Sequence, residues 1–127
     1  MKRFIPAGVH ETLDYATAGL WFSGPELFGM KELEPGSVYT TQVYGALVAI
    51  NTVLTDFGPN SKLGIGGIRL WSLKTHLVLD AIGSSIVILA PWVTGSRRRG
   101  WNYWVPHLAA GLIVWGSLSF TKFPEGE

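Results

Sequence analysis

Two stretches of the chain, VHETLD and THLVLD, each carry a histidine and an aspartate four residues apart. The first pair is His10 and Asp14, and the second is His76 and Asp80. Residues four apart lie on the same face of a helix, so each histidine can hydrogen-bond to its aspartate. Such pairs could form a proton relay, hold a haem or chlorophyll, or join helices as a polar clamp. The elements that carry the pairs decide among these roles.

The composition favours a chain that lies in lipid. Hydrophobic residues make up 47% of the 127 residues and charged residues 15%, whereas soluble domains average about 25% charged residues. The length predicts a single domain over 1–127. The absence of cysteine excludes disulfides, thiol nucleophiles and cysteine-ligated metals. The net charge of +1 gives no general attraction to nucleic acid.

Uncharged runs locate the expected helices, because about 20 helical residues cross a bilayer. Residues 35–55 and 100–121 contain no charged residue, and a third run at 81–96 extends backwards through the second His–Asp pair. The fourth candidate, 15–25, is shorter. We therefore expect four helices, at 8–28, 38–56, 73–94 and 102–122.

The sequence also contains an internal repeat. Residues 3–57 align with 69–123 at a constant offset of 66, without a gap. Ten residues of the first half are identical to the residue 66 positions later: Arg3, His10, Leu13, Asp14, Pro25, Gly29, Gly45, Val48, Thr55 and Phe57. Each half is then a helical hairpin, and 58–68 is a linker. Because each half has two spans, both enter the membrane from the same side as parallel repeats. The predicted fold is an all-α integral-membrane four-helix bundle of two hairpins.

The two hairpins resemble the SPW-repeat family of small bacterial membrane proteins. Each opens with a His-x-x-x-Asp helix and ends at a proline before a glycine. The second half reads LAPWVTG, close to the Ser-Pro-Trp turn of that family, while SGPELFG in the first half keeps only Pro25. The resemblance covers about residues 3–123 and implies the architecture, but it implies no activity.

The polar clamp is the favoured interpretation of His10, Asp14, His76 and Asp80, because ionisable groups at membrane depth persist when they face partners. If the first helices of both halves line the symmetry axis, the two pairs face each other. A proton relay is an alternative, although the second and fourth helices offer no acidic residue in mid-membrane. Axial ligation of a pigment or haem by His10, His76 or His107 is another. His107 aligns with Thr41, so a symmetric pigment pair could use only the first two. No metal site is assigned.

Basic residues suggest the orientation. The side with the termini would hold Lys2, Arg3, Lys62, Arg69, Lys74 and Lys122, and the other side Lys31, Arg97, Arg98 and Arg99. The positive-inside rule then places the termini in the cytoplasm of a multi-pass protein of the bacterial inner membrane. The arginine run at 97–99 could bind anionic lipid headgroups or an acidic partner, or act as a topology signal.

The sequence predicts an accessory subunit rather than an enzyme. No nucleophile–base arrangement is visible, and GIGG at 64–67 lacks the features of a phosphate loop. We expect the chain to pack against and stabilise a larger membrane complex, such as a photosynthetic or respiratory assembly. Its partners would be integral membrane proteins and lipids. No cofactor is required, although lipid or pigment could bind at the periphery. The alternatives are a small transporter or channel that uses the His–Asp pairs, and a pigment- or haem-binding protein.

Overall fold

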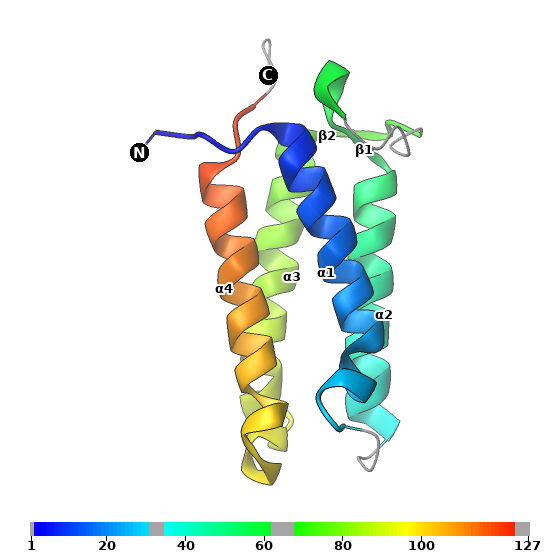
Figure 1. The fold of residues 1–127 in the computed structure, drawn as a ribbon, viewed down its shortest axis with the longest axis vertical. Helices are drawn as coiled ribbons and strands as arrows, with labels where there is room; N and C mark the ends of the chain where they lie inside the picture. Colours follow the sequence, from blue (N-terminus) through cyan, green and yellow to red (C-terminus); the bar gives the residue numbers. More distant parts are fainter. Residues whose placement is uncertain (1, 31–34, 62–67, 124–127) are drawn as a thin grey trace.

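Four long helices dominate the computed structural model, which describes residues 2–30, 35–61 and 68–123 (Figure 1). They are α1 (Ala7–Leu27), α2 (Pro35–Val53), α3 (Leu73–Val93) and α4 (Val105–Phe120). Short elements connect them: β1 (Thr55–Asp56), β2 (Trp71–Ser72) and 3-10 turns at Gly58–Asn60, Ser96–Arg99 and Trp101–Tyr103. The predicted all-α, four-helix character is confirmed.

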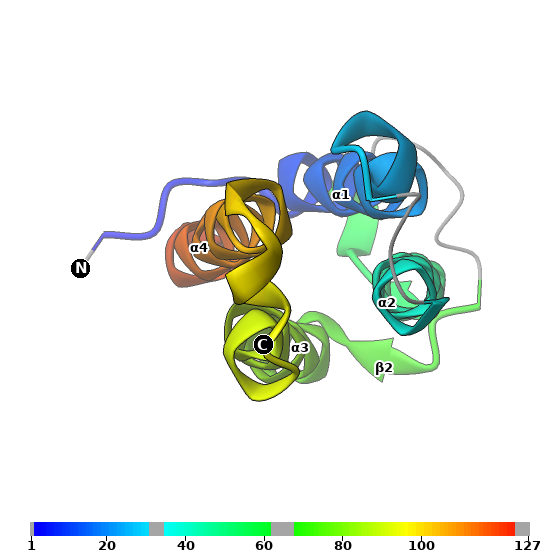
Figure 2. The ribbon, with the colours of Figure 1, turned by 90° about the horizontal axis from the view of Figure 1, so that it is seen from below.

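The helices form two hairpins that run in the same direction. Helix α1 packs mainly along α2, and α3 packs mainly along α4. Both α1 and α3 lead away from the end of the bundle that holds the termini, and α2 and α4 return to it (Figure 1). Viewed along the bundle, the four helices occupy the corners of a square, with α1 and α3 diagonally opposite (Figure 2).

Two short parallel pairings link the halves at the end that holds the termini. Thr55 in β1 pairs with Trp71 in β2, and Ile5 forms an isolated bridge with Thr121. The 66-residue offset relates Ile5 to Trp71 and Thr55 to Thr121. The two pairings are therefore equivalent positions of the repeat, with the two halves exchanged. The start of each half is therefore joined to the end of the other. Neither pairing is predictable from the sequence, because segments of one or two residues have no recognisable periodicity.

Three helix boundaries differ from the prediction by three residues. Helix α2 begins at Pro35 rather than at 38 and ends at Val53 rather than at 56, and α4 begins at Val105 rather than at 102. The delay in α4 arises because residues 101–103 form a 3-10 turn, and Pro106 then occupies the first turn of the helix, where proline is tolerated. Of the predicted linker, residues 62–67 lie outside the described part, as do Lys31 and Lys62 of the charge count.

The predicted turns after Pro25 and Pro91 take the form that their glycines suggest. Helices α1 and α3 each continue two residues beyond the proline before ending. Gly29 and Gly95 then adopt positive φ angles of 65° and 75°. This left-handed conformation is unfavourable for residues with a Cβ atom, which explains why both turns carry glycine.

Small residues let the helices of each hairpin approach closely. A Cβ atom added at Gly45 in α2 would lie 2.9 Å from the backbone oxygen of Ala18 in α1. At the equivalent Gly111 in α4, an added Cβ atom would collide with the side chain of Ile88 in α3. Each hairpin is thus closed by the same glycine contact.

The distribution of side chains is inverted relative to a soluble bundle. Buried polar residues include His10, Glu11, Asp14, Thr41, Asn51, Thr52, Thr55, His76, Asp80, Ser84, His107, Ser117 and Thr121. Large apolar side chains point outward instead, among them Leu20, Phe22, Val43, Leu47, Ile50, Val78, Ile82, Ile86, Leu89, Val93, Leu112 and Ile113. Within the described ranges, α3 alone combines the length and apolar composition that crossing a membrane requires. A single helix of this kind is weak support for a membrane location. Helix α4 has only 16 helical residues.

Candidate functional site

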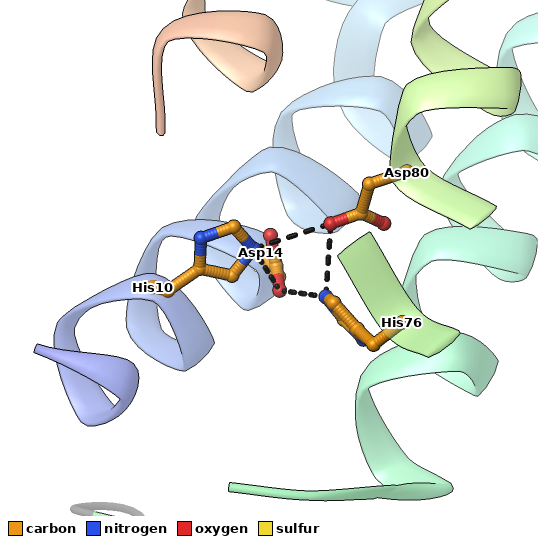
Figure 3. Close-up of side chains that lie close together, drawn as sticks. All are labelled: His10, Asp14, His76 and Asp80. Carbon is orange, nitrogen blue, oxygen red and sulfur yellow. Dashed lines mark hydrogen bonds and ion pairs between the residues drawn. The ribbon is translucent and has the colours of Figure 1, made fainter. Parts of the chain in front are cut away.

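The two predicted His–Asp pairs meet in the core near the end of the bundle that holds the termini (Figure 3). Helix α1 supplies His10 and Asp14, and α3 supplies His76 and Asp80; we call these four residues the His–Asp cluster. Its side chains are at most 6% exposed. The cluster lies one to two turns into each helix, and the same spacing in both halves places the pairs opposite each other.

Contacts in the cluster join the halves as well as the members of each pair. His76 Nε2 lies 2.9 Å from Oδ2 of both Asp14 and Asp80. His10 Nε2 lies 3.2 Å from Asp80 Oδ2 and 3.4 Å from Asp14 Oδ2. The sequence predicted the contacts within each pair and that the pairs would face each other. The shortest distances across the interface are as short as those within a pair, so α1 and α3 share a single group of charges.

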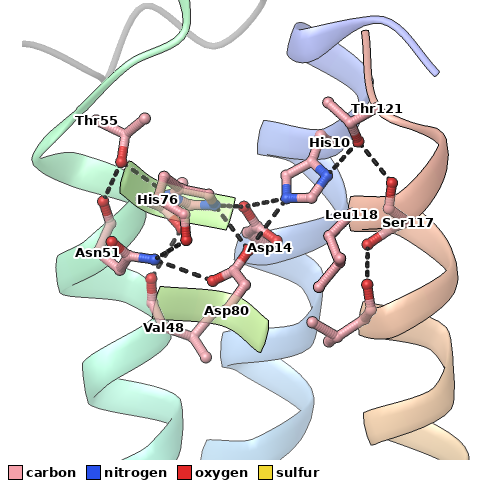
Figure 4. A network of polar contacts seen from close by, with 12 residues as sticks. His10, Asp14, Val48, Asn51, Thr55, His76, Asp80, Ser117, Leu118 and Thr121 are labelled. Atoms are coloured by element: carbon pink, nitrogen blue, oxygen red, sulfur yellow. Dashed lines mark hydrogen bonds and ion pairs between the residues drawn. The ribbon is translucent and has the colours of Figure 1, made fainter. Parts of the chain in front are cut away.

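Two threonines hold the outer nitrogens of the histidines (Figure 4). The Thr121 hydroxyl donates its one proton to the Ser117 carbonyl oxygen at 2.6 Å, and it therefore accepts a hydrogen bond from His10 Nδ1 at 2.7 Å. The Thr55 hydroxyl donates to the Asn51 carbonyl oxygen at 2.6 Å and accepts from His76 Nδ1 at 2.8 Å. Both Nδ1 atoms therefore carry a proton, and both Nε2 atoms face the carboxylates.

These threonines were missed as site residues, although the repeat marked them. Thr55 and Thr121 are one of its ten identical pairs, and each follows the end of the second helix of its half. The histidines near the start of the first helices and the threonines after the second helices are both identical between the halves. These two sets of identities could have suggested that the helix ends which carry them meet. The sequence alone offered no distance to support that inference.

One side of the cluster carries an additional support that the other side lacks. Asn51 Nδ2 donates to Asp80 Oδ1 at 2.9 Å, and Trp71 Nε1 donates to Asn51 Oδ1 at 3.1 Å. Trp71 thus fixes which way the Asn51 amide points. In the other half, Ser117 occupies the position of Asn51 and donates instead to the Val114 carbonyl oxygen. The cluster is therefore symmetric in its four ionisable groups but not in the groups around them.

Glu11 is a further buried carboxylate that the sequence analysis did not single out. Its side chain is fully buried, and the Ser61 hydroxyl lies 2.9 Å from both of its carboxylate oxygens. Leu77 occupies the equivalent position in the second half. Because the repeat is broken here, the repeat gave no signal for Glu11.

The third histidine lies apart from the cluster. His107 is in the first turn of α4, at the end of the bundle opposite the termini, and its ring packs against Trp21 at 5.0 Å between centroids. Its Nδ1 atom is buried and has no hydrogen-bond partner among the described residues. His107 therefore lies apart from His10 and His76, and the alternative that it ligates a pigment or haem on its own stays a prediction. Those two rings are fully buried with Nε2 facing carboxylates, which leaves no side open for a macrocycle.

The arginines at 97–99 lie in the 3-10 turn between α3 and α4, opposite the termini, with exposed side chains. Their proposed contact with lipid headgroups stays a prediction.

Two grooves run between the hairpins. One, of about 350 Å³, lies between α2 and α3 and reaches Asn51 and Asp80 at its polar end. The other, of about 240 Å³, lies between α1 and α4, where Trp21, Phe28 and Trp101 line it. The 66-residue offset relates several lining positions of the two grooves. Only the first groove touches the His–Asp cluster.

Comparison with known proteins yields no relative. No protein-family model, curated protein or solved structure matches the chain. The resemblance to the SPW-repeat family therefore remains a prediction from the motifs.

Proposed function

We propose that the chain is an integral-membrane accessory subunit that packs against and stabilises a larger membrane complex. The observation that carries this proposal is the inverted distribution of side chains. Large apolar side chains cover much of the outside of the helices, whereas the buried positions hold histidines, carboxylates, hydroxyls and an amide beside an apolar core. In water this arrangement would expose a large apolar surface, which soluble monomers rarely do. In lipid it is the expected one.

The small size of the loops supports a packing role. The described connections outside the helices are short 3-10 turns and two-residue strands. They provide little room for a receptor or catalytic domain outside the membrane. The apolar outer faces of four helices are available to lipid and to neighbouring membrane proteins. A photosynthetic or respiratory assembly is the kind of partner that we propose.

A transporter or channel is less well supported, because an apolar layer interrupts the buried polar positions along the bundle. Beyond the His–Asp cluster, a second core cluster of Trp21, Val87 and Ala110 fills the centre, with Tyr44 packed against it. Its Trp21 and Tyr44 rings lie edge to face at 5.4 Å between centroids. Conduction would require this apolar layer to open.

Native electrophoresis tests the proposal. Membranes from the source cells are washed with alkaline carbonate and solubilised in a mild detergent, and the chain is detected with an antibody. We expect it to resist the wash and to migrate with a complex much larger than itself. A harsher detergent serves as the control and should release the chain to low mass. Extraction by carbonate, or migration only as a small free species in the mild detergent, would contradict the proposal.

The orientation is part of the same proposal. Both termini lie at one end of the bundle, and Arg97–Arg99 lies at the other. We place the termini in the cytoplasm of a bacterial cell, on the charge count over both ends.

A further inference from the structure

We propose that His10, Asp14, His76 and Asp80 bind one divalent transition-metal cation, such as Zn²⁺ or Fe²⁺, between the two halves of the chain. The juxtaposition that carries this proposal is the convergence of two imidazole Nε2 atoms and two carboxylate Oδ2 atoms, all within 4.8 Å of one another, on four buried residues. The proposal is independent of a partner complex.

The histidines are held in the form that binds metal. Because the threonine hydroxyls accept from both Nδ1 atoms, a neutral imidazole has its lone pair on Nε2. Both Nε2 atoms point at the centre of the cluster (Figure 3). Metal-bound histidines commonly donate their other ring N–H to an oxygen acceptor, which fixes the tautomer and the ring orientation. Thr55 and Thr121 supply this feature once in each half.

Four of the six distances among the ligand atoms are close to the edges of a metal-centred tetrahedron. Bonds of about 2.0–2.1 Å to nitrogen and oxygen place neighbouring ligand atoms about 3.3 Å apart in a tetrahedral zinc site. The four histidine–aspartate distances range from 2.9 to 3.4 Å. The two remaining distances, between the histidine nitrogens and between the aspartate oxygens, lie within 4.8 Å, so binding a cation requires the side chains to adjust.

Hydrogen bonding accounts poorly for the same atoms. His76 Nε2 lies 2.9 Å from two carboxylate oxygens, and a single N–H cannot point at both. Despite these short distances, His76 Nε2 and Asp14 Oδ2 lack a hydrogen bond of acceptable geometry within the described structure. Both atoms are completely buried. Among the four ligand atoms, His10 Nε2 and Asp80 Oδ2 do form a hydrogen bond, at 3.2 Å.

The charges also favour a divalent cation. Two carboxylates and two neutral imidazoles carry a net charge of −2, which one divalent cation neutralises. Burying uncompensated charge is costly, so neutralisation at this position would stabilise the fold. Asn51 supports the site by donating to the Asp80 oxygen that does not face the centre. Such outer contacts orient ligating carboxylates.

The ligand set selects the class of metal. Two imidazoles with two carboxylates suit Zn²⁺, Fe²⁺ or Mn²⁺, whereas Ca²⁺ and Mg²⁺ prefer oxygen ligands alone. The groove between α2 and α3 reaches Asp80 and provides a route to the site. A bound cation would join α1 to α3, and thus one hairpin to the other.

Metal uptake by the purified protein tests the proposal. The full chain, in detergent micelles and without a polyhistidine tag, is treated with a chelator and dialysed against Zn²⁺. We expect one zinc per chain, measured by mass spectrometry of the elements. Co²⁺ used as a second probe should give the visible absorption of a tetrahedral nitrogen–oxygen site. Uptake well below one equivalent would overturn the proposal without any variant.

Variants localise the site. Asp14→Asn together with Asp80→Asn keeps the shape of both side chains and removes both charged ligands, and we expect zinc affinity to fall by more than 100-fold, beyond the roughly 10–100-fold typical of outer-contact losses. The control, His107→Asn, removes a buried histidine outside the cluster and should bind as tightly as the unmodified chain. Equal affinity in the double variant would show that zinc binds elsewhere and would overturn the proposal.

A milder variant covers the case in which the double variant does not fold. Thr121→Val leaves all four ligands in place and removes only the acceptor for His10 Nδ1. We expect it to weaken zinc binding by about 10–100-fold while one zinc per chain still binds at saturation. An unchanged affinity in a folded Thr121→Val protein would contradict the assigned role of the threonine and, with it, the proposed site.

Discussion

Replacing Asp14 with leucine is expected to lower the free energy of unfolding by about 3–5 kcal/mol, the usual cost of removing one partner from a buried ion pair. Asp14 is buried and lies 2.9 Å from His76 Nε2 and 3.4 Å from His10 Nε2. Without this carboxylate, Asp80 alone would face both histidines. Denaturant titration in mixed micelles, followed by circular dichroism, measures the change.

The matched control replaces an aspartate that makes an exposed ion pair. Asp56 lies 3.8 Å from Arg69, and both side chains are substantially exposed. Exposed pairs contribute about 0–1 kcal/mol, and asparagine keeps the Oδ1 atom that accepts from the Gly58 N–H at 2.9 Å, so Asp56→Asn should change the free energy of unfolding by no more than that. If Asp14→Leu were as mild as Asp56→Asn, the His–Asp cluster would not hold the halves together.

A simultaneous change of all four residues gives a different result. Substitution of His10, Asp14, His76 and Asp80 by apolar residues of similar volume leaves no buried charge without a partner. Such replacements are often neutral or stabilising. We therefore expect this variant to be more stable than Asp14→Leu, although it would lose the proposed metal.

The second large effect concerns the outer surface. Leu112 is near the middle of α4, with 57% of its side chain exposed. If that face meets lipid, Leu112→Asp should disfavour insertion by about 2.5–3.5 kcal/mol, the cost of a charged residue at the centre of a spanning helix. The fraction of the chain recovered in membranes should fall accordingly. Fractionation of cells that express each variant at the same level measures this fall.

The depth of the substituted residue in the membrane, rather than its exposure alone, should decide whether the variant inserts. Val93 is the last residue of α3 and is 83% exposed. At the membrane boundary a charge is tolerated, so Val93→Asp should insert normally. Equal recovery of both variants in membranes, or a gain in soluble yield for Leu112→Asp, would show that the apolar outer face does not lie in lipid.

The sequence was sufficient to predict the helices and their pairing into hairpins. Long uncharged runs marked the second and fourth helices, and the offset between His10 and His76 assigned the two ambiguous ones. The helix starts were less accurate, since Pro35 extends α2 and the 3-10 turn at 101–103 shortens α4. Local backbone geometry at a helix end depends on tertiary contacts that no periodic pattern records.

The candidate site was predicted only in part. Helical spacing was enough to pair His10 with Asp14, and the repeat suggested that the two pairs face each other. The contacts of Thr55, Thr121 and Asn51 depend on how the end of one helix meets the start of another, which the sequence does not specify. Glu11 is absent from the repeat and was missed for that reason.

The proposed metal site could not be inferred before the structure was known. A histidine and an aspartate four residues apart supply two ligands, and two such pairs supply four only if their ligand atoms converge. Convergence is a property of the interface between α1 and α3. Two halves related by a two-fold axis bring identical groups together at that axis. A cation bound there would accept ligands from the His–Asp pair of each half.

The apolar outer surface and the polar core support the central claim that this bundle lies in a membrane, and spin labels test the claim directly. The chain has no cysteine, so single cysteines at Ile82, Ile86 and Leu112 can each be labelled uniquely in liposomes. A label at Arg98, in the exposed turn, is the control. We predict that dissolved oxygen relaxes the three helix labels more strongly than a water-soluble nickel complex does, and that the reverse holds at Arg98. Strong relaxation by nickel at all four positions would contradict the account.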